Sequence, residues 1–408
     1  MPCIRATEAS LVRILFINQY FPPDAANSSY ILGELAEDLA RHHDVQVLAG
    51  RPSYSAVATT FRPQGVDIVR VWSTTFDRTS IVGRLVNYAT FSVSSAFRAC
   101  RLQRPDLVVA MTDPPIIGLV GLLAARRYCR PLVQISHDVY PDIAMALGRV
   151  RSRLLVRAWR RINATVRSAA ASIIVVGRDM SERLIAESVD PAKIEVIPTW
   201  ASAQPVDAAV RARTRREMGW GDTFVVMHAG NAGLAQNLGV VLDAAEALRD
   251  EQDVRIVVLG DGAAKRGLQA RAARADLQNV VFLAHRPKEE AQRLMQAADL
   301  HVVTLVPGLW GCAAPSKTYG IMAAARPFVA VVDEGSEPAR IVRDYDCGTH
   351  VHAGDGRGLA DAIRRLRGTE LDAAGQRALV AFREHYTREQ ATTATRIHLE
   401  RVARERAA

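Results

Sequence analysis

The sequence has 408 residues, of which 49% are hydrophobic and 23% are charged, and its formal net charge is +9. This length exceeds one ordinary hydrophobic core and predicts two or three domains. The longest strongly apolar run, residues 116–125, is too short for a membrane-spanning helix, which needs roughly 20 such residues.

The first ten residues are polar, and the apolar run that follows them is too short for a signal peptide. Five cysteines lie far apart without a C-x-x-C pair, which predicts neither a metal set nor a disulfide framework and favours a reducing compartment. We therefore expect a cytoplasmic protein. Its positive charge favours acidic partners such as phosphorylated substrates, anionic lipid or nucleic acid.

Short apolar runs alternate with longer amphipathic stretches through the first half of the chain. Residues 28–41 are one such stretch, with Ile31, Leu35 and Leu39 on one face of a helix. Runs that are apolar at nearly every position are typical of parallel strands covered by helices on both sides. The predicted strands are residues 12–18, 45–49, 68–71, 107–111, 132–136, 172–176 and 194–198.

The strand signal stops at about residue 201, where a polar, alanine-rich stretch predicts an interdomain connection. A second β/α series follows, with strands predicted at residues 224–230, 254–260, 280–284, 300–305, 327–332 and 348–353. We therefore predict an α/β protein of two Rossmann-like, doubly wound domains that face each other across a cleft. The predicted parts are an N-terminal domain at 1–200, a linker at 201–222, a C-terminal domain at 223–385, and a C-terminal helix at 386–408. Whether this helix packs against the first domain is left open by the sequence.

Polar residues follow two predicted strands of the first domain, at the edge where open parallel sheets bind ligands. In the loop after the first strand, a polar residue at 27–29 predicts a helix cap. The loop after residue 136 carries His137, Asp138 and Asp142, side chains suited to binding or proton handling. Ordinary βα loops with a structural histidine remain the alternative.

Glycine turns follow two consecutive predicted strands of the second domain. The first turn carries Gly230 and Asn231, and the second carries Gly260, Asp261 and Gly262. Glycine lets the backbone approach a ligand closely, and the start of the next helix suits phosphate. The second turn alone is a common turn signal, but the two together indicate a nucleotide.

A lysine is predicted in the first turn of a helix near residue 317. Ser316 is the predicted cap, and Lys317 would follow it at the positive end of the helix dipole. A cation is unfavourable there unless an anion compensates it, which favours diphosphate binding. A lysine that faces solvent is the alternative.

Arginine is concentrated at residues 149–167, which predict a helix with Leu155, Trp159, Ile162 and Val166 on one face. An apolar face flanked by arginines is typical of a helix that lies on an anionic lipid surface. A helix packed on the core with a solvated basic face explains the pattern equally well. The predicted membrane-surface residues are Arg157, Trp159, Arg160 and Arg161.

The motifs taken together resemble the family-4 glycosyltransferases of GT-B fold. The resemblance rests on six sequence segments: ILFINQYFPPD, RPDLVVAMTDPP, QISHDVYPD, HAGNAG, LGDG and APSKTYGIMAAARPFVAVVDEGSEPARIV. The chain looks most similar to the bacterial branch that builds capsule, colanic acid and O-antigen, typified by N-acetyl-L-fucosamine transferases. None of the motifs identifies the sugar.

The resemblance implies a retaining transfer from a nucleotide-diphosphate sugar, without a metal or other cofactor, to a glycan or polyprenyl-diphosphate-linked acceptor at the inner membrane face. It places His137 and Lys317 as catalytic residues, His137 beside the transferred sugar and Lys317 at the diphosphate. Donor binding is expected from Gly230, Asn231, Gly260, Asp261, Gly262, Arg286, Pro315, Ser316 and Lys317. The expected acceptor-side residues are Asn18, Pro22, Asp24, Ser28, Asp138 and Asp142.

The sequence departs from the family pattern at two positions. Cys312 and Gly320 stand where most members carry two glutamates, the second of which normally holds the ribose. A catalytically silent nucleotide-sugar-binding partner protein is therefore one alternative, and a GT-B nucleotide-sugar 2-epimerase is another. A dehydrogenase is disfavoured because no G-x-G-x-x-G follows the first strand of either half, and no module for nucleic acid is recognised.

Overall fold

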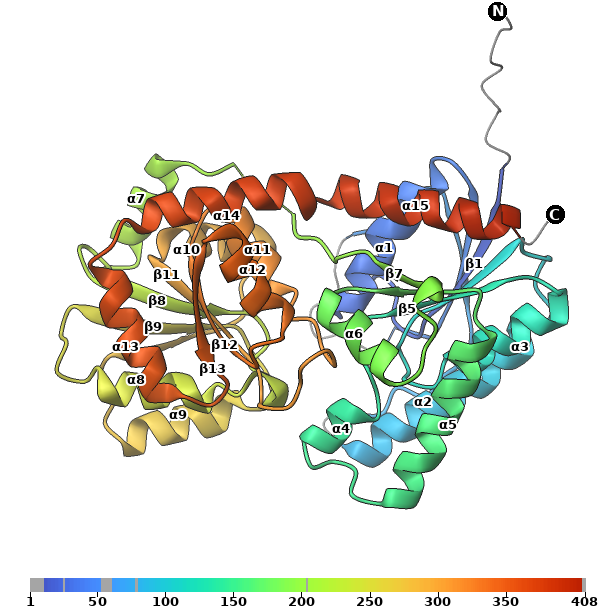
Figure 1. The fold of residues 1–408 in the computed structure, drawn as a ribbon, viewed down its shortest axis with the longest axis horizontal. Coiled ribbons are helices and arrows are strands. Elements are labelled where there is room, and N and C mark those ends of the chain that lie inside the picture. The colour runs from blue at the N-terminus through green and yellow to red at the C-terminus, as the bar shows by residue number, and fades with distance from the viewer. Residues whose placement is uncertain (1–10, 25, 53–60, 78–79, 203–204, 406–408) are drawn as a thin grey trace, which may run out of the picture.

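The computed structural model describes residues 11–24, 26–52, 61–77, 80–202 and 205–405, which form two α/β domains (Figure 1). Every pair of neighbouring strands is parallel. The strand order is β3-β2-β1-β4-β5-β6-β7 in the first sheet and β10-β9-β8-β11-β12-β13 in the second. The predicted fold of two doubly wound, Rossmann-like domains is thereby confirmed.

The strands are the short apolar runs of the sequence. Strands such as β4, β11 and β12 are buried at every position because helices cover both faces of each sheet. The first sheet consists of β1 (Arg13–Ile17), β2 (Asp44–Ala49), β3 (Val66–Arg70), β4 (Leu107–Ala110), β5 (Leu132–Ser136), β6 (Ser172–Val175) and β7 (Ile194–Val196). The second consists of β8 (Phe224–Ala229), β9 (Val254–Leu259), β10 (Val280–Leu283), β11 (Leu300–Thr304), β12 (Phe328–Val332) and β13 (Gly348–His352).

Helices connect successive strands in both domains. The first domain contains α1 (Asn27–Ala40), α2 (Ile81–Ala99), α3 (Gly118–Tyr128), α4 (Asp142–Ala146), α5 (Arg153–Ala169) and α6 (Arg178–Ala186). The connection and second domain contain α7 (Ala208–Glu217), α8 (Gly239–Ala247), α9 (Lys265–Arg274), α10 (Lys288–Ala297), α11 (Lys317–Ala323), α12 (Glu337–Tyr345), α13 (Gly356–Arg367) and α14 (Leu371–His385). Short 3-10 turns lie at Pro191–Lys193 and Leu234–Gln236.

The last helix, α15 (Arg388–Glu405), returns to the first domain. It follows α14 along the top of Figure 1, so that the end of the chain runs across both domains. Leu399 and Val402 are buried with residues of β1 and α1. The Arg388 guanidinium is 2.8 Å from the Asp38 carboxylate of α1. The two domains are therefore joined by this helix as well as by the connection at residue 201.

The predicted helix cap at residues 27–29 is wrong, because the cap position of α1 is Ala26. Ser316 occupies the cap position of α11 as predicted, but its side chain makes no capping bond to that helix. The hydroxyls are used elsewhere: Ser28 donates to Asp113 at 2.6 Å, and the Ser316 hydroxyl lies 3.4 Å from the Asn27 amide nitrogen. Tertiary partners compete with the local capping bond for the same oxygen.

None of the cysteines within the described residues forms a disulfide. Cys100, Cys129, Cys312 and Cys347 are free thiols, and Cys3 lies outside the described residues. None of the described helices combines the length and the apolar character that crossing a membrane requires.

Candidate functional site

The carboxyl ends of the two sheets meet at the domain interface. After β5, the Val139 N–H donates to the Cys312 carbonyl at 2.7 Å, and Asp138 forms an antiparallel bridge with Ala313. At the start of α1, the Asn27 amide lies 3.4 Å from the Ser316 hydroxyl. The loops that precede α1 and α4 in the first domain therefore contact the loop that precedes α11 in the second.

Lys317 is the first residue of α11, and its partly buried side chain turns back toward the end of β8. Its Nζ lies 3.2 Å from Nε2 of His228 and donates to the side-chain carbonyl of Gln236. Burial lowers the pKa of Lys317 to about 7. Burial and the neighbouring lysine hold the pKa of His228 well below its usual range. The described residues place no carboxylate in ion-pair contact with Lys317, so a cation here lacks a counter-charge.

Gln236 and His228 are site residues that the sequence did not single out. Gln236 lies in the short 3-10 turn after β8, and the Thr304 hydroxyl donates to its backbone carbonyl. His228 belongs to the apolar run of β8, whose periodicity gives no sign of a contact with residue 317. The signal that could have identified His228 is that a polar residue stands inside a buried strand.

The two glycine turns pack on each other beside Lys317. Gly230 and Gly260 have φ of 135° and 127°, a conformation that L side chains rarely adopt. A Cβ on Gly260 would overlap the Gly230 carbonyl, and one on Gly262 would overlap Ala232. A Cβ on Gly230 would lie 3.6 Å from Cε of Lys317. Both turns thus need glycine for packing, and the exposed backbone of Gly230 and Asn231 lies next to the lysine.

Asp261 connects the turn after β9 to the loop after β10. Its carboxylate accepts from Lys265 at 2.8 Å and from the His285 N–H at 2.9 Å, and both contacts lower its pKa. Arg286 follows in an exposed stretch and lies 3.4 Å from Glu290. Asp261 therefore orders the loops, while the backbone near Arg286 stays accessible.

On the first-domain side, His137 and Asp138 lie in the loop that touches Ala313. Burial lowers the pKa of His137 to about 4, so the imidazole is neutral at pH 7. Burial and the nearby Asp113 raise the pKa of Asp138 to about 7. Asp113, which accepts from Ser28, is a third residue that the sequence did not single out. A neutral imidazole and a carboxyl group that titrates near pH 7 can exchange hydrogen bonds with sugar hydroxyls.

Other predicted acceptor-side residues are buried within the first domain. Asn18 is 0% exposed and Asp24 is 1% exposed, and the Asn18 amide donates to the Tyr20 carbonyl at 2.8 Å. The Pro22 carbonyl accepts from Arg70 at 2.6 Å. These residues shape the loop from inside it.

Asp142, at the start of α4, is also buried, and it is ion-paired. Its carboxylate lies 2.6 Å from Arg160 of α5 and 3.0 Å from Arg183 of α6. Arg183 also donates to the Trp310 carbonyl of the second domain at 3.1 Å. Asp142 therefore holds three elements together beside the interface.

The two positions that depart from the family pattern differ in surroundings. Cys312 is fully buried, and burial raises the pKa of its thiol to about 12. A Cβ added at Gly320 would make an ordinary van der Waals contact, 3.5 Å from Cε of Met295. Close packing does not require glycine at position 320.

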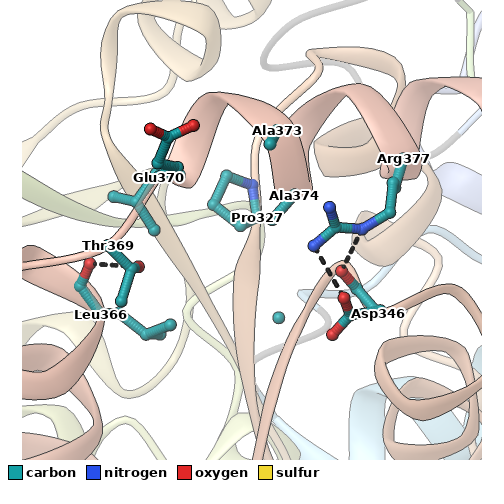
Figure 2. Close-up of a pocket in the computed structure, with 10 residues that line it drawn as sticks. Pro327, Asp346, Leu366, Thr369, Glu370, Ala373, Ala374 and Arg377 are labelled. Atoms are coloured by element: carbon teal, nitrogen blue, oxygen red, sulfur yellow. Dashed lines mark hydrogen bonds and ion pairs between the residues drawn. The ribbon is translucent and has the colours of Figure 1, made fainter.

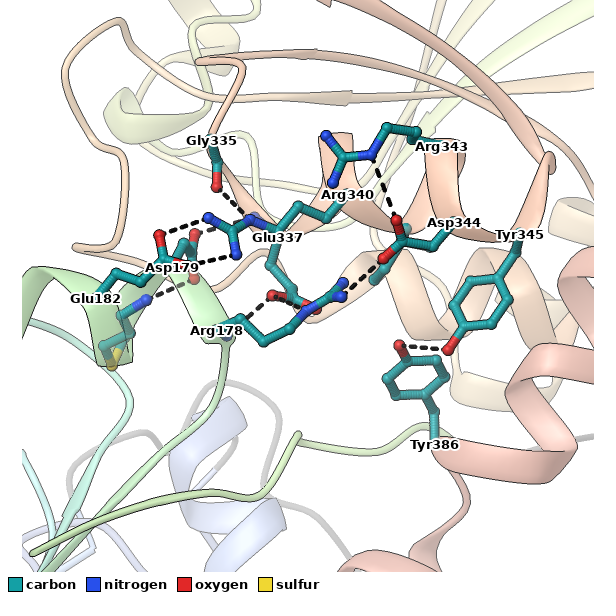
Figure 3. A network of polar contacts seen from close by, with 12 residues as sticks. Arg178, Asp179, Glu182, Gly335, Glu337, Arg340, Arg343, Asp344, Tyr345 and Tyr386 are labelled. Atoms are coloured by element: carbon teal, nitrogen blue, oxygen red, sulfur yellow. Dashed lines mark hydrogen bonds and ion pairs between the residues drawn. The ribbon is translucent and has the colours of Figure 1, made fainter. Parts of the chain in front are cut away.

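A network of charges joins α6 to α12 across the domain interface (Figure 3). The Arg178 N–H donates to the Glu337 carboxylate at 2.9 Å, and the Glu337 N–H donates to Asp179 at 3.0 Å, so each helix start is capped by the other domain. Two further arginine–carboxylate contacts flank this exchange. We call this set the interdomain network: Arg178, Asp179, Glu182, Glu337, Arg340 and Asp344.

The predicted membrane face of α5 is divided in the structure. Its carboxyl half is packed on the core, with Val166 3% exposed, whereas Leu155 at the amino end is 64% exposed. The Trp159 ring is parallel to Tyr140 at 5.8 Å and lies against the domain. Arg157, Arg160 and Arg161 are exposed. Only the amino-terminal part of α5 thus leaves apolar side chains uncovered.

A small cavity of about 310 Å³ lies between α13, α14 and the second sheet (Figure 2). Pro327 and Gly348 place it at the amino ends of β12 and β13, and Arg377 pairs with Asp346 at 2.9 Å on its wall. Ligands of open parallel sheets bind at the opposite edge. The described residues also contain no group of three or more His, Cys, Asp or Glu that could hold a metal ion.

Two family models match the chain, one on each domain. Residues 29–200 match the glycosyl transferase 4-like domain, and residues 223–368 match the glycosyl transferases group 1 domain. The chain is 28% identical over 301 residues to the probable glycosyltransferase WbjE of Pseudomonas aeruginosa, covering 73% of this chain and 74% of that protein. It is 25% identical over 358 residues to the putative colanic acid biosynthesis glycosyl transferase WcaI of Escherichia coli K12, covering 82% and 86%.

Solved structures share the fold over nearly the whole chain. Anabaena HepE in complex with UDP and glucose superposes with a TM-score of 0.73 at 17% identity, covering 95% of this chain and 99% of that one. Sucrose-phosphate synthase from Thermosynechococcus elongatus superposes with a TM-score of 0.77 at 15% identity, covering 95% and 98%. At these identities the likeness shows the two-domain architecture.

Proposed function

Since this chain belongs to the glycosyltransferases of group 1 type, we propose that it moves a sugar, with retention, from a nucleoside-diphosphate donor to a lipid-linked glycan in surface polysaccharide synthesis. The named role of the relative WcaI in colanic acid biosynthesis supports the pathway class. The HepE complexes with UDP support the donor class. The observation that carries the proposal is Lys317, a desolvated cation without a carboxylate partner beside two glycine turns.

Lys317 would stabilise the leaving diphosphate without a metal ion. Negative charge develops on the diphosphate as the glycosidic bond breaks, and a cation held in place by the protein lowers the energy of that state. The backbone of Gly230 and Asn231 lies beside the lysine and would contact the same phosphates. Gln236 and His228 orient the ammonium group.

His137 and Asp138 would bind sugar hydroxyls on the first-domain side. With a pKa of about 4, His137 is neutral at pH 7 and both donates and accepts a hydrogen bond. We assign it a place at the transferred sugar, and Asp138 a place at the acceptor. The sugar that we propose to be transferred is a hexosyl or N-acetylhexosaminyl group.

The protein would work at the cytoplasmic face of the membrane, bound peripherally. Large apolar side chains are exposed on α2 and at the start of α5, next to exposed arginines, as expected of a surface that meets anionic lipid. The exposed apolar residues are Val82, Leu85, Val93, Phe97, Leu154 and Leu155.

A silent nucleotide-sugar-binding protein is the second candidate, because neither Cys312 nor Gly320 supplies a carboxylate. Thermal unfolding of the full chain with a panel of nucleotides and UDP-sugars tests donor binding first. A ligand at a hundredfold excess over Kd stabilises the folded state by about 2.7 kcal/mol. Absence of stabilisation by every nucleotide would contradict both candidates.

Turnover separates the two candidates. We expect slow release of UDP from the bound donor, and we expect His137→Ala to reduce this rate on the order of a hundredfold while UDP affinity changes little. Donor binding without hydrolysis or transfer would favour the silent protein. An unchanged rate in a folded His137→Ala protein would remove the histidine from the site.

A further inference from the structure

A second concavity, of about 520 Å³, lies on the first domain between α4 and the amino-terminal half of α5. In Figure 1 these helices form the lower end of the right-hand domain, beside the second domain. Five of the nine residues that line it are arginines, and none is acidic. The lining residues are Met145, Val150, Arg151, Arg153, Val156, Arg157, Arg160, Arg161 and Ala164.

Most of these arginines have no counter-charge. Within the described part of the chain, Arg160 pairs with Asp142, whereas the other four form no ion pair with a carboxylate. Arg153, Arg157 and Arg161 follow each other at intervals of four residues, so like charges are neighbours on one helix face, which destabilises the helix. A concave surface with such a charge set is stabilised when a multivalent anion occupies it.

Exposed apolar side chains adjoin the arginines. Met145, on the wall of the concavity, is 39% exposed, and Leu154 and Leu155, at the amino end of α5, are 74% and 64% exposed. A free inorganic anion would leave these apolar side chains exposed to water. A phosphate group attached to an apolar chain would bury them while it pairs with the guanidinium groups.

We propose that this concavity binds the diphosphate of a polyprenyl-diphosphate-linked acceptor, with the lipid chain directed along the exposed leucines. The inference rests on the proposed function, because it assigns a place to the acceptor of that reaction. Guanidinium groups suit this ligand because each can donate two parallel hydrogen bonds to phosphate oxygens.

The chain also limits how far this site lies from the reacting sugar. Asp138, at the domain interface, precedes Met145 by seven residues, which span at most about 25 Å when fully extended. The ion pairs of Asp142 with Arg160 and Arg183 hold the intervening α4 in place. The Met145 wall of the concavity therefore lies within about 25 Å of the loop at the domain interface.

The test uses the full chain and neutral phosphatidylcholine vesicles that contain either a polyprenyl diphosphate or phosphatidylglycerol at equal negative charge. We compare wild type with the variant Arg153→Gln/Arg157→Gln/Arg161→Gln. Arg160 is kept because it pairs with Asp142. The matched control, Arg104→Gln/Arg126→Gln/Arg127→Gln, removes three exposed charges elsewhere on the same domain.

We expect wild type to prefer the diphosphate vesicles and inorganic pyrophosphate to compete for binding. The pocket variant should bind these vesicles on the order of a hundredfold more weakly, and the control variant should retain the preference. Equal binding to both vesicle types, or equal losses in both variants, would overturn the proposal in favour of a general attraction to anionic surfaces. Failure of pyrophosphate to compete with wild type would overturn it without any variant.

UDP binding distinguishes failure of this inference from failure of the proposed function. The pocket variant should bind UDP as wild type does, because the arginines lie outside the Lys317 site. If wild type binds UDP but shows no preference for diphosphate vesicles, only the acceptor site is wrong. If it shows no preference for diphosphate vesicles and binds no nucleotide of the panel, the proposed function is wrong as well.

Discussion

Two charged regions at the domain interface differ in the partners of their cations. In the interdomain network, Arg178 contacts Glu337 and Asp344, and hydrogen bonds to those carboxylates raise its pKa. Among the described residues, the polar contacts of the Lys317 ammonium group are a neutral imidazole and an amide, and burial lowers its pKa to about 7. Both cations lie where loops of one domain approach the other.

The difference distinguishes a structural charge from a binding charge. A cation whose carboxylates are provided by the fold is satisfied in the free protein, so its removal weakens the fold. A desolvated cation without such a partner costs folding free energy and regains it when an anion binds. Variants in the two regions should therefore have opposite effects on stability and on donor affinity.

The largest effect is expected from Lys317→Met. Loss of a charge-assisted contact should weaken UDP binding by about 2–3 kcal/mol, which is roughly 30–150-fold. The free protein should be at least as stable at pH 7, because methionine carries no desolvated charge. Calorimetric titration with UDP and urea unfolding measure the two quantities, with Lys193→Met, just before β7, as the control. Unchanged UDP affinity would show that the lysine does not meet the diphosphate.

Glu337→Gln should have the converse effect. The glutamate is nearly buried and accepts from both the backbone and the guanidinium of Arg178, so loss of its charge should lower the free energy of unfolding by about 2 kcal/mol. Arg178 is half-exposed, which keeps this below the cost of a fully buried pair. Asp344→Asn, which removes a more exposed partner of the same arginine, should cost less than about 1 kcal/mol. An equal loss of unfolding free energy in the two variants would contradict the larger contribution that we assign to Glu337.

UDP affinity should depend on pH through Lys317. The free protein holds this lysine at a pKa of about 7, and a bound diphosphate raises it again. Above pH 7, binding then takes up a proton, so affinity should fall as pH rises, by at most about tenfold per pH unit. Titrations at pH 7, 8 and 9 measure the slope, which Lys317→Arg should abolish because arginine stays charged. A flat profile in wild type would place the ammonium group away from the phosphates.

The smallest effect is expected from Gly320→Glu. The added Cβ makes an ordinary contact with Met295, and replacing glycine inside a helix stabilises it by up to about 1 kcal/mol. Stability should therefore stay equal or rise, and UDP should bind as well as before or more tightly if the carboxylate reaches the ribose. Gly320→Ala separates the helix effect from the carboxylate effect. A loss of stability in both variants would show that glycine is required after all.

Much of the architecture could be predicted because its signals are local. Apolar runs such as β11 and β12 are buried on both faces, and that pattern is readable without knowing the neighbours of a strand. The turns at Gly230 and Gly260 were also recognisable, since L side chains rarely adopt φ values such as their 135° and 127°. The same local logic placed Ser316 correctly at the cap position of α11 and misplaced the cap of α1. It could not predict the hydrogen bonds of Ser28 and Ser316, because both hydroxyls contact residues distant in the sequence.

The sequence by itself determined the two sheets, the order of their strands along the chain and the edge at which a ligand could bind. Only the tertiary structure decided that Lys317 meets His228 and Gln236, that Glu337 belongs to the network around Arg178, and that Asp142 is an ion-paired support. Periodicity reports what each residue does within its own helix or strand. Ion pairing, desolvation and the resulting pKa depend on which loops the packed sheets bring together, and no local pattern contains that information.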